Sequence, residues 1–241
     1  GCDFVNRDGD PSDDNGHGTH VAGIVAAVGD NGIGVAGVAY SSRILPVKVL
    51  DQGGGGFIST VIKGIDYVTN LKRRGVPIVA INLSLGGSTN SSALQRAIER
   101  ARNYDILVVA AAGNESSNND ASPLYPANLP LENILSVAAV TSSGLLSSFS
   151  NYGVSSVHLA APGSSILSLG NSGYRVLSGT SMAAPHVAGV AALIKSAQPG
   201  LTMTQVRSII VESVQNVPSL VGLISTSGIV DADAAVQSAR A

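Results

Sequence analysis

The stretch Ile106-Leu107-Val108-Val109-Ala110-Ala111-Ala112 is apolar at every position and is followed at once by Gly113-Asn114. A run without polar alternation is typical of a strand that is covered on both faces, as in a parallel sheet. Comparable runs recur along the chain, at Ile44–Leu50, Ile78–Leu83, Ile134–Val140 and Val157–Ala160. The sequence therefore predicts a mostly parallel sheet at the centre of the protein.

Helical patterns separate several of these runs, at Val21–Val28, Ile58–Leu71 and Ala93–Tyr104. A strand followed by a helix and another strand, repeated along a chain, gives a doubly wound α/β fold with helices on both faces. The later part turns helical, with a pattern over Ala183–Ser196, a capping box formed by Thr202 and Gln205, and a last helix that begins at Asp231. Residues 1–241 contain no internal repeat and no linker, so we expect one domain.

The composition limits the classes of protein to which the chain can belong. Its 241 residues are 44% hydrophobic and 12% charged, with a formal net charge of −2. That charge gives no basic footprint for nucleic acid. Polar residues also interrupt every apolar run before it reaches the roughly 18 residues of a membrane span. The single cysteine, Cys2, excludes an intramolecular disulfide. We therefore expect a thick core, with neither nucleic acid nor a membrane as partner.

Glycine-containing loops follow three of the predicted strands. They read Asp51-Gln52-Gly53-Gly54-Gly55-Gly56, Ser84-Leu85-Gly86-Gly87 and Gly113-Asn114-Glu115. In open α/β sheets, ligands bind outside the carboxyl ends of the strands, where such loops lie. We therefore expect the three loops to line one cleft. The first of them is not a phosphate loop, because no Gly-Lys-Ser/Thr follows the glycines.

Two polar segments open Ala/Val-rich helices: Asn15-Gly16-His17-Gly18-Thr19-His20-Val21-Ala22-Gly23 and Ser178-Gly179-Thr180-Ser181-Met182-Ala183-Ala184-Pro185-His186. A serine hydroxyl needs an adjacent base to become nucleophilic near neutral pH, and histidine is the usual one. A serine at a helix start also has its main-chain N–H beside the oxyanion that acyl transfer generates. His17 and Ser181 are therefore candidates for nucleophilic catalysis.

These two segments resemble the histidine and serine motifs of the subtilases, and Ala110-Ala111-Ala112-Gly113-Asn114-Glu115 resembles the asparagine motif of their oxyanion hole. The three motifs occur in the family's order and at similar spacings, over almost the whole chain. The resemblance implies that Ser181 is the nucleophile, that His17 is the general base and later the acid, and that Asn114 donates its amide to the oxyanion. An α/β-hydrolase would instead have Gly-x-Ser-x-Gly and its histidine last.

The resemblance also implies where a peptide binds. Main-chain hydrogen bonds would add the peptide as a strand between the loop that follows residue 83 and the Gly53–Gly56 edge. Ala111 and Gly113 would form the floor of the pocket for the residue before the scissile bond, with Leu124 deeper and Glu115 at the rim. This pocket would prefer an apolar residue. The residues that the resemblance assigns to substrate binding are Gly54, Ser84, Leu85, Gly86, Ala111, Gly113 and Leu124.

The other histidines are interpreted as structural residues. His20 shares a motif with His17 but points elsewhere on the predicted helix. His186 lies in the pattern of a packed helix, and His158 lies in a predicted strand. We therefore expect none of the three to act in catalysis.

The region before His17 is acidic, with five aspartates within Asp3–Asp14. Oxygen ligands at alternate positions in a glycine-containing turn suit Ca²⁺, although the spacing is not that of an EF-hand. The stretch resembles the calcium loop of thermitase-like subtilases, which implies a structural calcium ion. The alternative is a solvated turn whose aspartates cap helices. The calcium ligands that the resemblance implies are Asp3, Asp8 and Asp10, helped by Asn6 and Ser12.

One element of the family pattern is missing. In subtilases, the aspartate that holds the catalytic histidine follows the first core strand, and neither that strand nor its turn occurs among the sixteen residues before His17. Asp13 and Asp14 lie too close in sequence to reach the far side of the imidazole. We therefore expect the domain to be N-terminally incomplete, with its first core strand absent, and the aspartate to come from a segment outside this chain.

Two functions of different classes follow from these features. The first is a secreted or extracellular serine endopeptidase that acts on proteins and peptides. Its other partners would be the missing N-terminal segment of the same protease and an inhibitory propeptide. The second is a catalytically incomplete fragment, or pseudoprotease, that binds peptides without cleaving them. The presence of both His17 and Ser181 favours the protease, and an intracellular subtilase would show the same sequence features.

Overall fold

Most of the predicted apolar runs form neighbouring strands of one sheet. A computed structural model describes residues 1–241. The strand order is β3-β4-β5-β6-β10-β9, and every neighbouring pair is parallel except the last. The strands are β3 (Ala80–Leu83), β4 (Leu107–Ala111), β5 (Ile134–Val140), β6 (Leu159–Pro162), β10 (Gly228–Ile229) and β9 (Gln215–Asn216).

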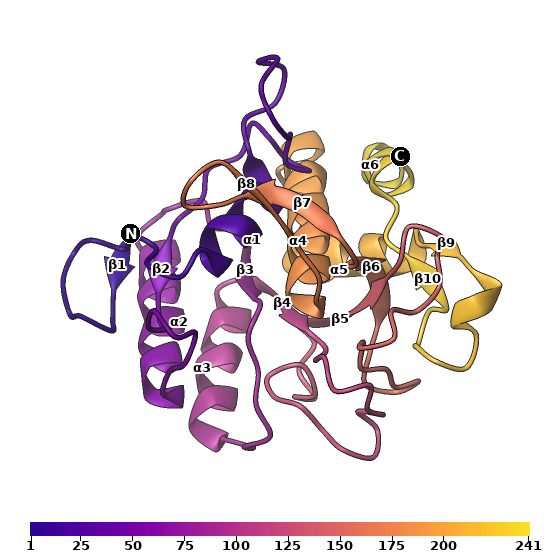
Figure 1. The fold of residues 1–241 in the computed structure, drawn as a ribbon, viewed down its shortest axis with the longest axis horizontal. Coiled ribbons are helices and arrows are strands. Elements are labelled where there is room, and N and C mark those ends of the chain that lie inside the picture. Colours follow the sequence, from indigo (N-terminus) through magenta and orange to yellow (C-terminus); the bar gives the residue numbers. More distant parts are fainter.

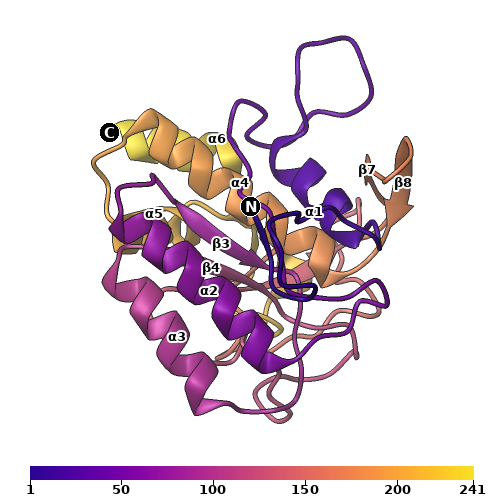
Figure 2. The ribbon, with the colours of Figure 1, turned by 90° about the vertical axis from the view of Figure 1, so that its left-hand side faces the viewer.

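Helices cover both faces of this sheet (Figure 1, Figure 2). They are α1 (His17–Ala26), α2 (Ile58–Arg73), α3 (Ser92–Asn103), α4 (Thr180–Ala197), α5 (Met203–Glu212) and α6 (Ala232–Arg240), with a 3-10 helix, η1 (Pro218–Leu220). Leu107 and Val109 of β4 belong to the core that contains buried residues of α4, α5 and α6. Val108 belongs to the core that contains buried residues of α2 and α3. Burial on both sides explains the absence of polar alternation and confirms the α/β fold.

A β-hairpin that the sequence did not predict lies beside α1. Its strands are β7 (Ile166–Leu169) and β8 (Tyr174–Leu177), which pair in antiparallel fashion. The first three residues of β8 are exposed, so the hairpin lacks the apolar pattern of a core strand. The fully buried His20 holds it to α1, because Nε2 lies 3.0 Å from the carbonyl oxygen of Ile166 and 3.1 Å from that of Arg175.

The predicted strand at Ile44–Leu50 is shorter than expected and lies apart from the main sheet. Only Val47–Lys48 forms a strand, β2, which pairs in parallel with β1 (Cys2–Asp3). β2 is not paired with β3, and β3 forms one edge of the main sheet. The main-chain N–H and C=O groups on the outer side of β3 therefore have no strand as partner.

The predicted helix caps are confirmed. Thr202 and Gln205 form the capping box of α5, and the side chain of Asp231 accepts a hydrogen bond from the N–H of Ala234 at 2.9 Å. α1 and α4 begin earlier than the apolar patterns suggest, because the polar motif residues themselves are helical. No helix is both long enough and apolar enough to cross a membrane.

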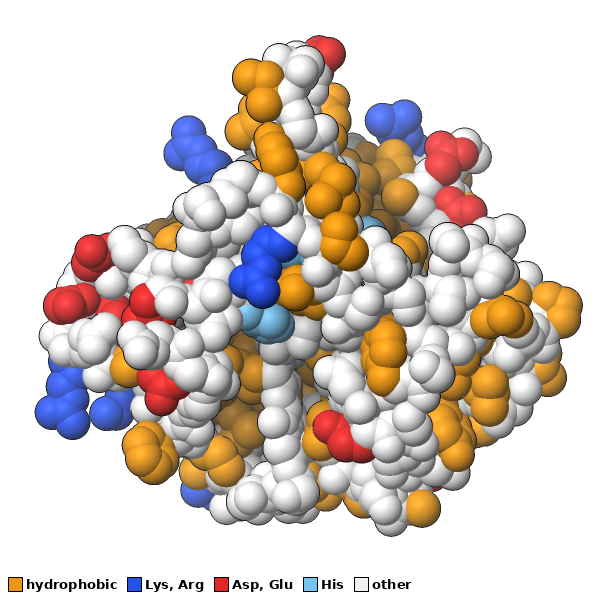
Figure 3. Space-filling model, in the orientation of Figure 1, with side chains coloured by type: hydrophobic (Ala, Val, Ile, Leu, Met, Phe, Trp, Pro, Cys, Tyr) orange, Lys and Arg blue, Asp and Glu red, His pale blue; other side chains and the backbone are white.

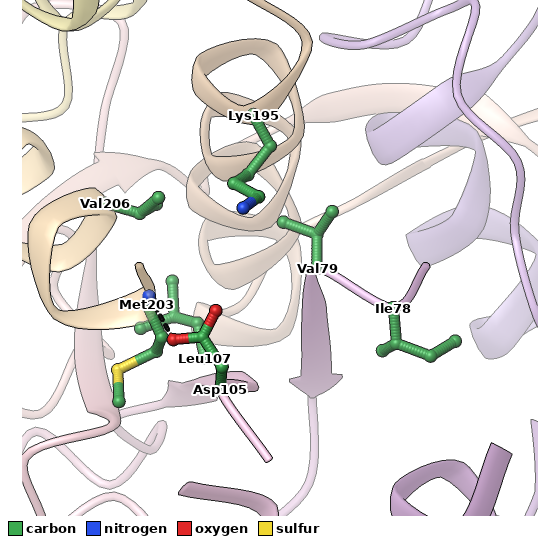
Figure 4. Close-up of a pocket in the computed structure, with 7 residues that line it drawn as sticks. All are labelled: Ile78, Val79, Asp105, Leu107, Lys195, Met203 and Val206. Atoms are coloured by element: carbon green, nitrogen blue, oxygen red, sulfur yellow. Dashed lines mark hydrogen bonds between the residues drawn. The ribbon is translucent and has the colours of Figure 1, made fainter. Parts of the chain in front are cut away.

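A small cavity, drawn in Figure 4, lies where β3 and β4 begin, at the opposite end of these strands from the glycine-containing loops. Its volume is about 10 Å³, which leaves room for one water molecule at most. Asp105 in its wall accepts a hydrogen bond from the N–H of Met203 at 2.6 Å, and Lys195 binds the carbonyl oxygens of Pro199 and Leu201. These charges support the packing of α4 and α5.

Candidate active site

The carboxylate of Asp13 organises the start of α1. Oδ1 accepts hydrogen bonds from the N–H groups of Asn15 and Gly16, both at 2.9 Å. Oδ2 accepts from the N–H and the hydroxyl of Thr19, both at 2.7 Å. Burial raises the pKa of Asp13, but these hydrogen bonds outweigh it and lower the pKa to about 2. Asp13 is therefore occupied by the N–H groups at the start of α1 and makes no hydrogen bond with the His17 ring.

His17 is the first residue of α1, and its imidazole lies free at the surface of the cleft. Its main-chain N–H donates to Oδ1 of Asn15 at 3.1 Å, but the ring makes no hydrogen bond and pairs with no carboxylate. Burial lowers the pKa of His17; the charge of Asp13 raises it and that of Arg175 lowers it. On the face shown in Figure 3, histidine atoms border a central hollow beneath a basic side chain. The ring is thus poised as a neutral base.

Ser181, the second residue of α4, is tied to the loop that follows β3. The hydroxyl of Ser84 donates to the carbonyl oxygen of Ser181 at 2.8 Å. In return, the hydroxyl of Ser181 donates to the carbonyl oxygen of Ser84 at 3.3 Å. Nδ2 of Asn82 donates to the hydroxyl of Ser84 at 2.9 Å. No hydrogen bond joins Ser181 to His17.

The side-chain amide of Asn114 is held at the start of α4 by its oxygen. Its Oδ1 accepts from the N–H of Thr180 at 2.8 Å and from the Thr180 hydroxyl at 3.0 Å. A Cβ built on Gly179 would lie 3.7 Å from Nδ2 of Asn114 and 3.7 Å from the main-chain nitrogen of Ser181. Oδ1 of Asn114 lies 3.6 Å from the same point, so the whole amide and the Ser181 nitrogen lie together at the start of α4. The sequence analysis did not identify the role of Thr180.

The predicted pocket residues Gly86, Gly113 and Leu124 come together. Cδ2 of Leu124 would lie 2.8 Å from a Cβ on Gly86 and 2.9 Å from one on Gly113, so the leucine lies between the two glycines. Gly87 and Tyr125 exchange main-chain hydrogen bonds of 2.9 and 2.8 Å, which join the two walls. Ala111 is buried at the end of β4. Leu85 and Gly86 make no main-chain hydrogen bonds within the protein, so they are free to pair with a peptide.

The glycine loop after β2 forms a tight turn around Asp51. Oδ1 of Asp51 accepts from the N–H groups of Gly53 at 2.9 Å and Gly55 at 3.0 Å. Nδ2 of Asn15 donates to the carbonyl oxygen of Gln52 at 2.8 Å, which joins this turn to the start of α1. Gly54 is exposed at the tip of the turn. The three predicted loops thus surround the amino ends of α1 and α4.

The remaining histidines lie in structural surroundings, as predicted. His20 is fully buried against the hairpin. Nδ1 of His158 accepts from the N–H of Ser136 at 3.0 Å, and burial, followed by the charge of Arg207, lowers its pKa to about 4. His186 is bonded to the carbonyl oxygen of Met182 at 2.8 Å, within α4.

The structure does not bring Asp3, Asp8 and Asp10 together as a metal site, and no group of three acidic, histidine or cysteine side chains in the chain does so. Each carboxylate instead accepts hydrogen bonds from residues just after it. Asp3 is buried and accepts from the N–H groups of Val5 at 2.6 Å and Asn6 at 2.8 Å. Asp8 accepts from the N–H of Asp10, and Asp10 from Ser12. Local turns explain why the alternating spacing does not produce convergence.

Comparison with known proteins shows close similarity over the whole described chain. Residues 2–231 match the sequence pattern of the subtilase family. A thermostable alkaline protease of Halalkalibacterium halodurans is 43% identical over 241 residues, covering 98% of this chain and 62% of that protein. An extracellular protease of Xanthomonas campestris is 43% identical over 238 residues, covering 92% and 40%. The chain thus spans less than two thirds of either relative. A solved protease structure from Pseudoalteromonas arctica superposes with a TM-score of 0.82 at 42% identity, covering 92% of this chain and 70% of that one.

Proposed function

The chain belongs to the subtilase family, and on that premise we propose that it forms the catalytic part of a serine endopeptidase that hydrolyses peptide bonds through an acyl-enzyme. The observation that supports this most strongly is the orientation of Asn114. Its oxygen is held by two hydrogen bonds from Thr180, which supports a role for its nitrogen as a donor beside the N–H of Ser181. Such a pair of donors has an obvious use only when negative charge develops there.

The residues of the chain then take the following roles. The Ser181 hydroxyl attacks the carbonyl carbon of the scissile bond while His17 accepts its proton. The oxyanion accepts hydrogen bonds from Asn114 and from the Ser181 N–H. His17 next donates its proton to the leaving amine, and the acyl-enzyme remains on Ser181. Water, deprotonated by the same imidazole, releases the second product.

The substrate is proposed to be an extended segment of a protein or peptide. The free main-chain groups of Leu85 and Gly86 support β-type pairing with it, which recognises the backbone rather than a sequence. On the other side the exposed turn at Gly54 would form the opposite edge. The position of the Leu124 side chain beside Gly86 and Gly113 supports a preference for an apolar residue before the scissile bond.

The carboxylate that orients His17 is proposed to come from chain outside residues 1–241. Two observations support this: no carboxylate pairs with the imidazole, and the outer edge of β3 has no strand partner. A sample is first shown to be active and then denatured, and the intact masses of its chains test the idea. An active species that consists of residues 1–241 alone would refute it.

The second candidate function is a protein that binds peptides without cleaving them. The Ser181 hydroxyl donates to Ser84 rather than to His17, which favours this reading if the arrangement persists when substrate is bound. An inhibitory propeptide in the same cleft is a further proposed partner, since it would use the same free backbone edge at Leu85 and Gly86.

A structural calcium ion at the acidic loop stays a proposal, supported by the family resemblance and by the five aspartates before α1. The present arrangement of Asp3, Asp8 and Asp10 does not form a ligand set, so binding would require Asp8 and Asp10 to give up their turn hydrogen bonds. Thermal unfolding in excess Ca²⁺ and in excess chelator tests it. An unchanged midpoint would remove calcium from the account.

We also propose that the protein acts outside the cell, which the name of the extracellular Xanthomonas campestris relative supports. The test of function itself is hydrolysis of unfolded casein and of a chromogenic peptide by the full protein. The Ser181→Ala variant is the matched control. We expect hydrolysis that disappears in the variant; binding of the peptide without hydrolysis by the unaltered protein would instead establish the second candidate.

A further inference from the structure

We propose that Asn151 is a positioning residue of the oxyanion hole, which fixes the main chain that carries Asn114 without touching substrate. The inference rests on the proposed protease function. Asn151 lies between β5 and β6, in a part of the chain that contains none of the three motifs. It is nevertheless the residue on which the hydrogen bonds of the Asn114 loop converge.

Asn151 holds this loop with both ends of its amide. Oδ1 accepts from the N–H of Glu115 at 2.8 Å and from that of Ser117 at 3.1 Å. Nδ2 lies 3.2 Å from the carbonyl oxygen of Ala112 and 2.8 Å from Oε2 of Glu115. The main-chain N–H of Asn151 also donates to the carbonyl oxygen of Gly113, the residue just before Asn114, at 2.9 Å. The main chain on both sides of Asn114 is therefore bound to one residue.

Burial makes this arrangement specific. Asn151 is 1% exposed and Asn119 is 0% exposed. Oδ1 of Asn119 lies 3.0 Å from Nδ2 of Asn151, and Nδ2 of Asn119 donates to the carbonyl oxygen of Ala112 at 2.8 Å. Buried amides must keep their partners, and a fully bonded network of them permits one arrangement. The loop lies outside the helices and strands, so this network sets its shape.

Glu115 links the network to the main chain of Asn114. Its Oε2 accepts from the N–H of Asn114 at 2.9 Å and from Nδ2 of Asn151 at 2.8 Å. The side chain of Asn114 is held separately, by Thr180. Thr180 thus sets the direction of the amide, whereas Asn151 sets the position of the backbone from which the amide extends.

The position of an oxyanion donor matters because its hydrogen bond is strongest at one geometry, the transition state. A displacement of about 1 Å costs on the order of 100-fold in rate. Main-chain pairing through Leu85 and Gly86 uses groups that Asn151 does not bind, whereas Gly113 of the predicted pocket belongs to the loop that it holds. Loss of Asn151 should therefore reduce kcat more than it raises KM.

The experiment uses Asn151→Asp and Asn151→Ala in the full protein, alone and combined with Asn114→Ala. The aspartate variant keeps the shape of the side chain but replaces its donor by an acceptor that repels Glu115. We expect each single variant to lower kcat about 10- to 100-fold with KM within about threefold. In the Asn114→Ala background the same change should lower kcat by less than about twofold, because the donor that Asn151 positions is gone.

Asn133 provides the matched control. It is also 0% exposed, and its Nδ2 donates to the carbonyl oxygens of Ile98 and Ile106, at the start of β5 and away from the cleft. Asn133→Ala should lower the unfolding midpoint about as much as Asn151→Ala while kcat stays within about twofold. A variant of Asn151 that fails to fold is replaced by Glu115→Gln, which changes an exposed member of the same network.

The possible results separate this inference from the proposed function. Unchanged kcat in the Asn151 variants, equal losses in both backgrounds, or an equal loss in Asn133→Ala would overturn the inference while leaving an active protease. If the unaltered protein hydrolysed no substrate at all, both would fall, because no oxyanion would form.

Discussion

The side-chain oxygen of Asn114 accepts two hydrogen bonds from Thr180, one from the main-chain N–H at 2.8 Å and one from the hydroxyl at 3.0 Å. The same hydroxyl accepts from the N–H of Gly113 at 3.1 Å. A single buried threonine at the start of α4 therefore connects the end of β4 to the helix that carries Ser181. This contact sets the orientation of the Asn114 amide.

Replacing this hydroxyl should slow the chemical step. Thr180→Val keeps the shape of the side chain but removes one bond to Asn114 and leaves the Gly113 N–H without its acceptor. A loss of about 1.4 kcal/mol corresponds to about a tenfold fall in kcat. Thr180→Ser, which keeps the hydroxyl, is the control. Equal kcat values in the two variants, measured on a peptide substrate, would contradict the role given to Thr180.

Asn114→Ala should have a larger effect than Thr180→Val, since it removes the donor itself. In subtilisin itself, loss of the corresponding donor lowers kcat by about 10²–10³. The comparison of kcat and KM in the two variants checks the order of the effects.

The pH dependence of activity should respond to Arg175. Burial lowers the pKa of His17, the charge of Asp13 raises it, and the charge of Arg175 lowers it further. Since a general base must be neutral, activity rises as the pH passes upward through this pKa. Arg175→Gln should raise the pKa and move the acid limb of kcat/KM to higher pH. Lys63→Gln, an exposed change on α2, is the control, and coincident acid limbs would refute the predicted coupling.

The cap formed by Asp13 should contribute measurably to stability. Asp13→Ala removes four hydrogen bonds at the start of α1 and should lower the free energy of unfolding by about 1–2 kcal/mol at pH 7. Asp14→Ala removes only a partly exposed ion pair with Lys48 and should cost less than about 1 kcal/mol.

Urea unfolding of both variants checks this difference, and its pH dependence provides a second reading. The pKa of Asp13 is lowered from 3.8 to about 2, so its contribution is present above pH 3.8 and disappears as the pH falls toward 2. A gap between the unaltered protein and Asp13→Ala that stayed constant down to pH 2 would be inconsistent with this interpretation.

His158 should make the protein less stable in mild acid. Its pKa falls from 6.5 to about 4 in the folded state, so the unfolded chain binds the proton more readily between these values. Stability is therefore full above pH 6.5 and falls by up to about 3 kcal/mol as the pH drops to 4. His158→Gln removes this titration and should flatten the profile between pH 6.5 and 4. Parallel profiles, measured by urea unfolding, would show that His158 does not titrate as stated.

The central sheet was predictable from sequence, because a strand that is buried on both faces appears in the sequence as an uninterrupted apolar run. Ile134–Val140 is apolar throughout, and the predicted strand coincides with β5. The hairpin β7–β8 has no such apolar run, because β8 is largely exposed. The hairpin is held by His20, a residue far away in sequence. The strand predicted at Ile44–Leu50 is only two residues long in the structure, because β1, its only partner strand, pairs with it over two residues.

The site was predictable where it depends on residues that occur together in a motif. The predictions for His17, Ser181 and Asn114 fall in this class, and in the structure His17 and Ser181 lie at helix starts and Asn114 in a loop. Thr180 and Asn151 do not, because their role depends on hydrogen bonds to residues distant in the chain. In the acidic loop, the structure differs from the predicted arrangement of the side chains. Its spacing indicated convergence, but each aspartate is satisfied by the nearest N–H groups.

The most direct test of the central claim is labelling of Ser181 by a fluorophosphonate in the full protein, followed by intact mass and peptide mapping. The account predicts rapid addition of one label per molecule, located on Ser181, absent in Ser181→Ala and strongly slowed in His17→Ala. No labelling of a folded protein, or a label on another residue, would contradict the assignment of Ser181 as an activated nucleophile.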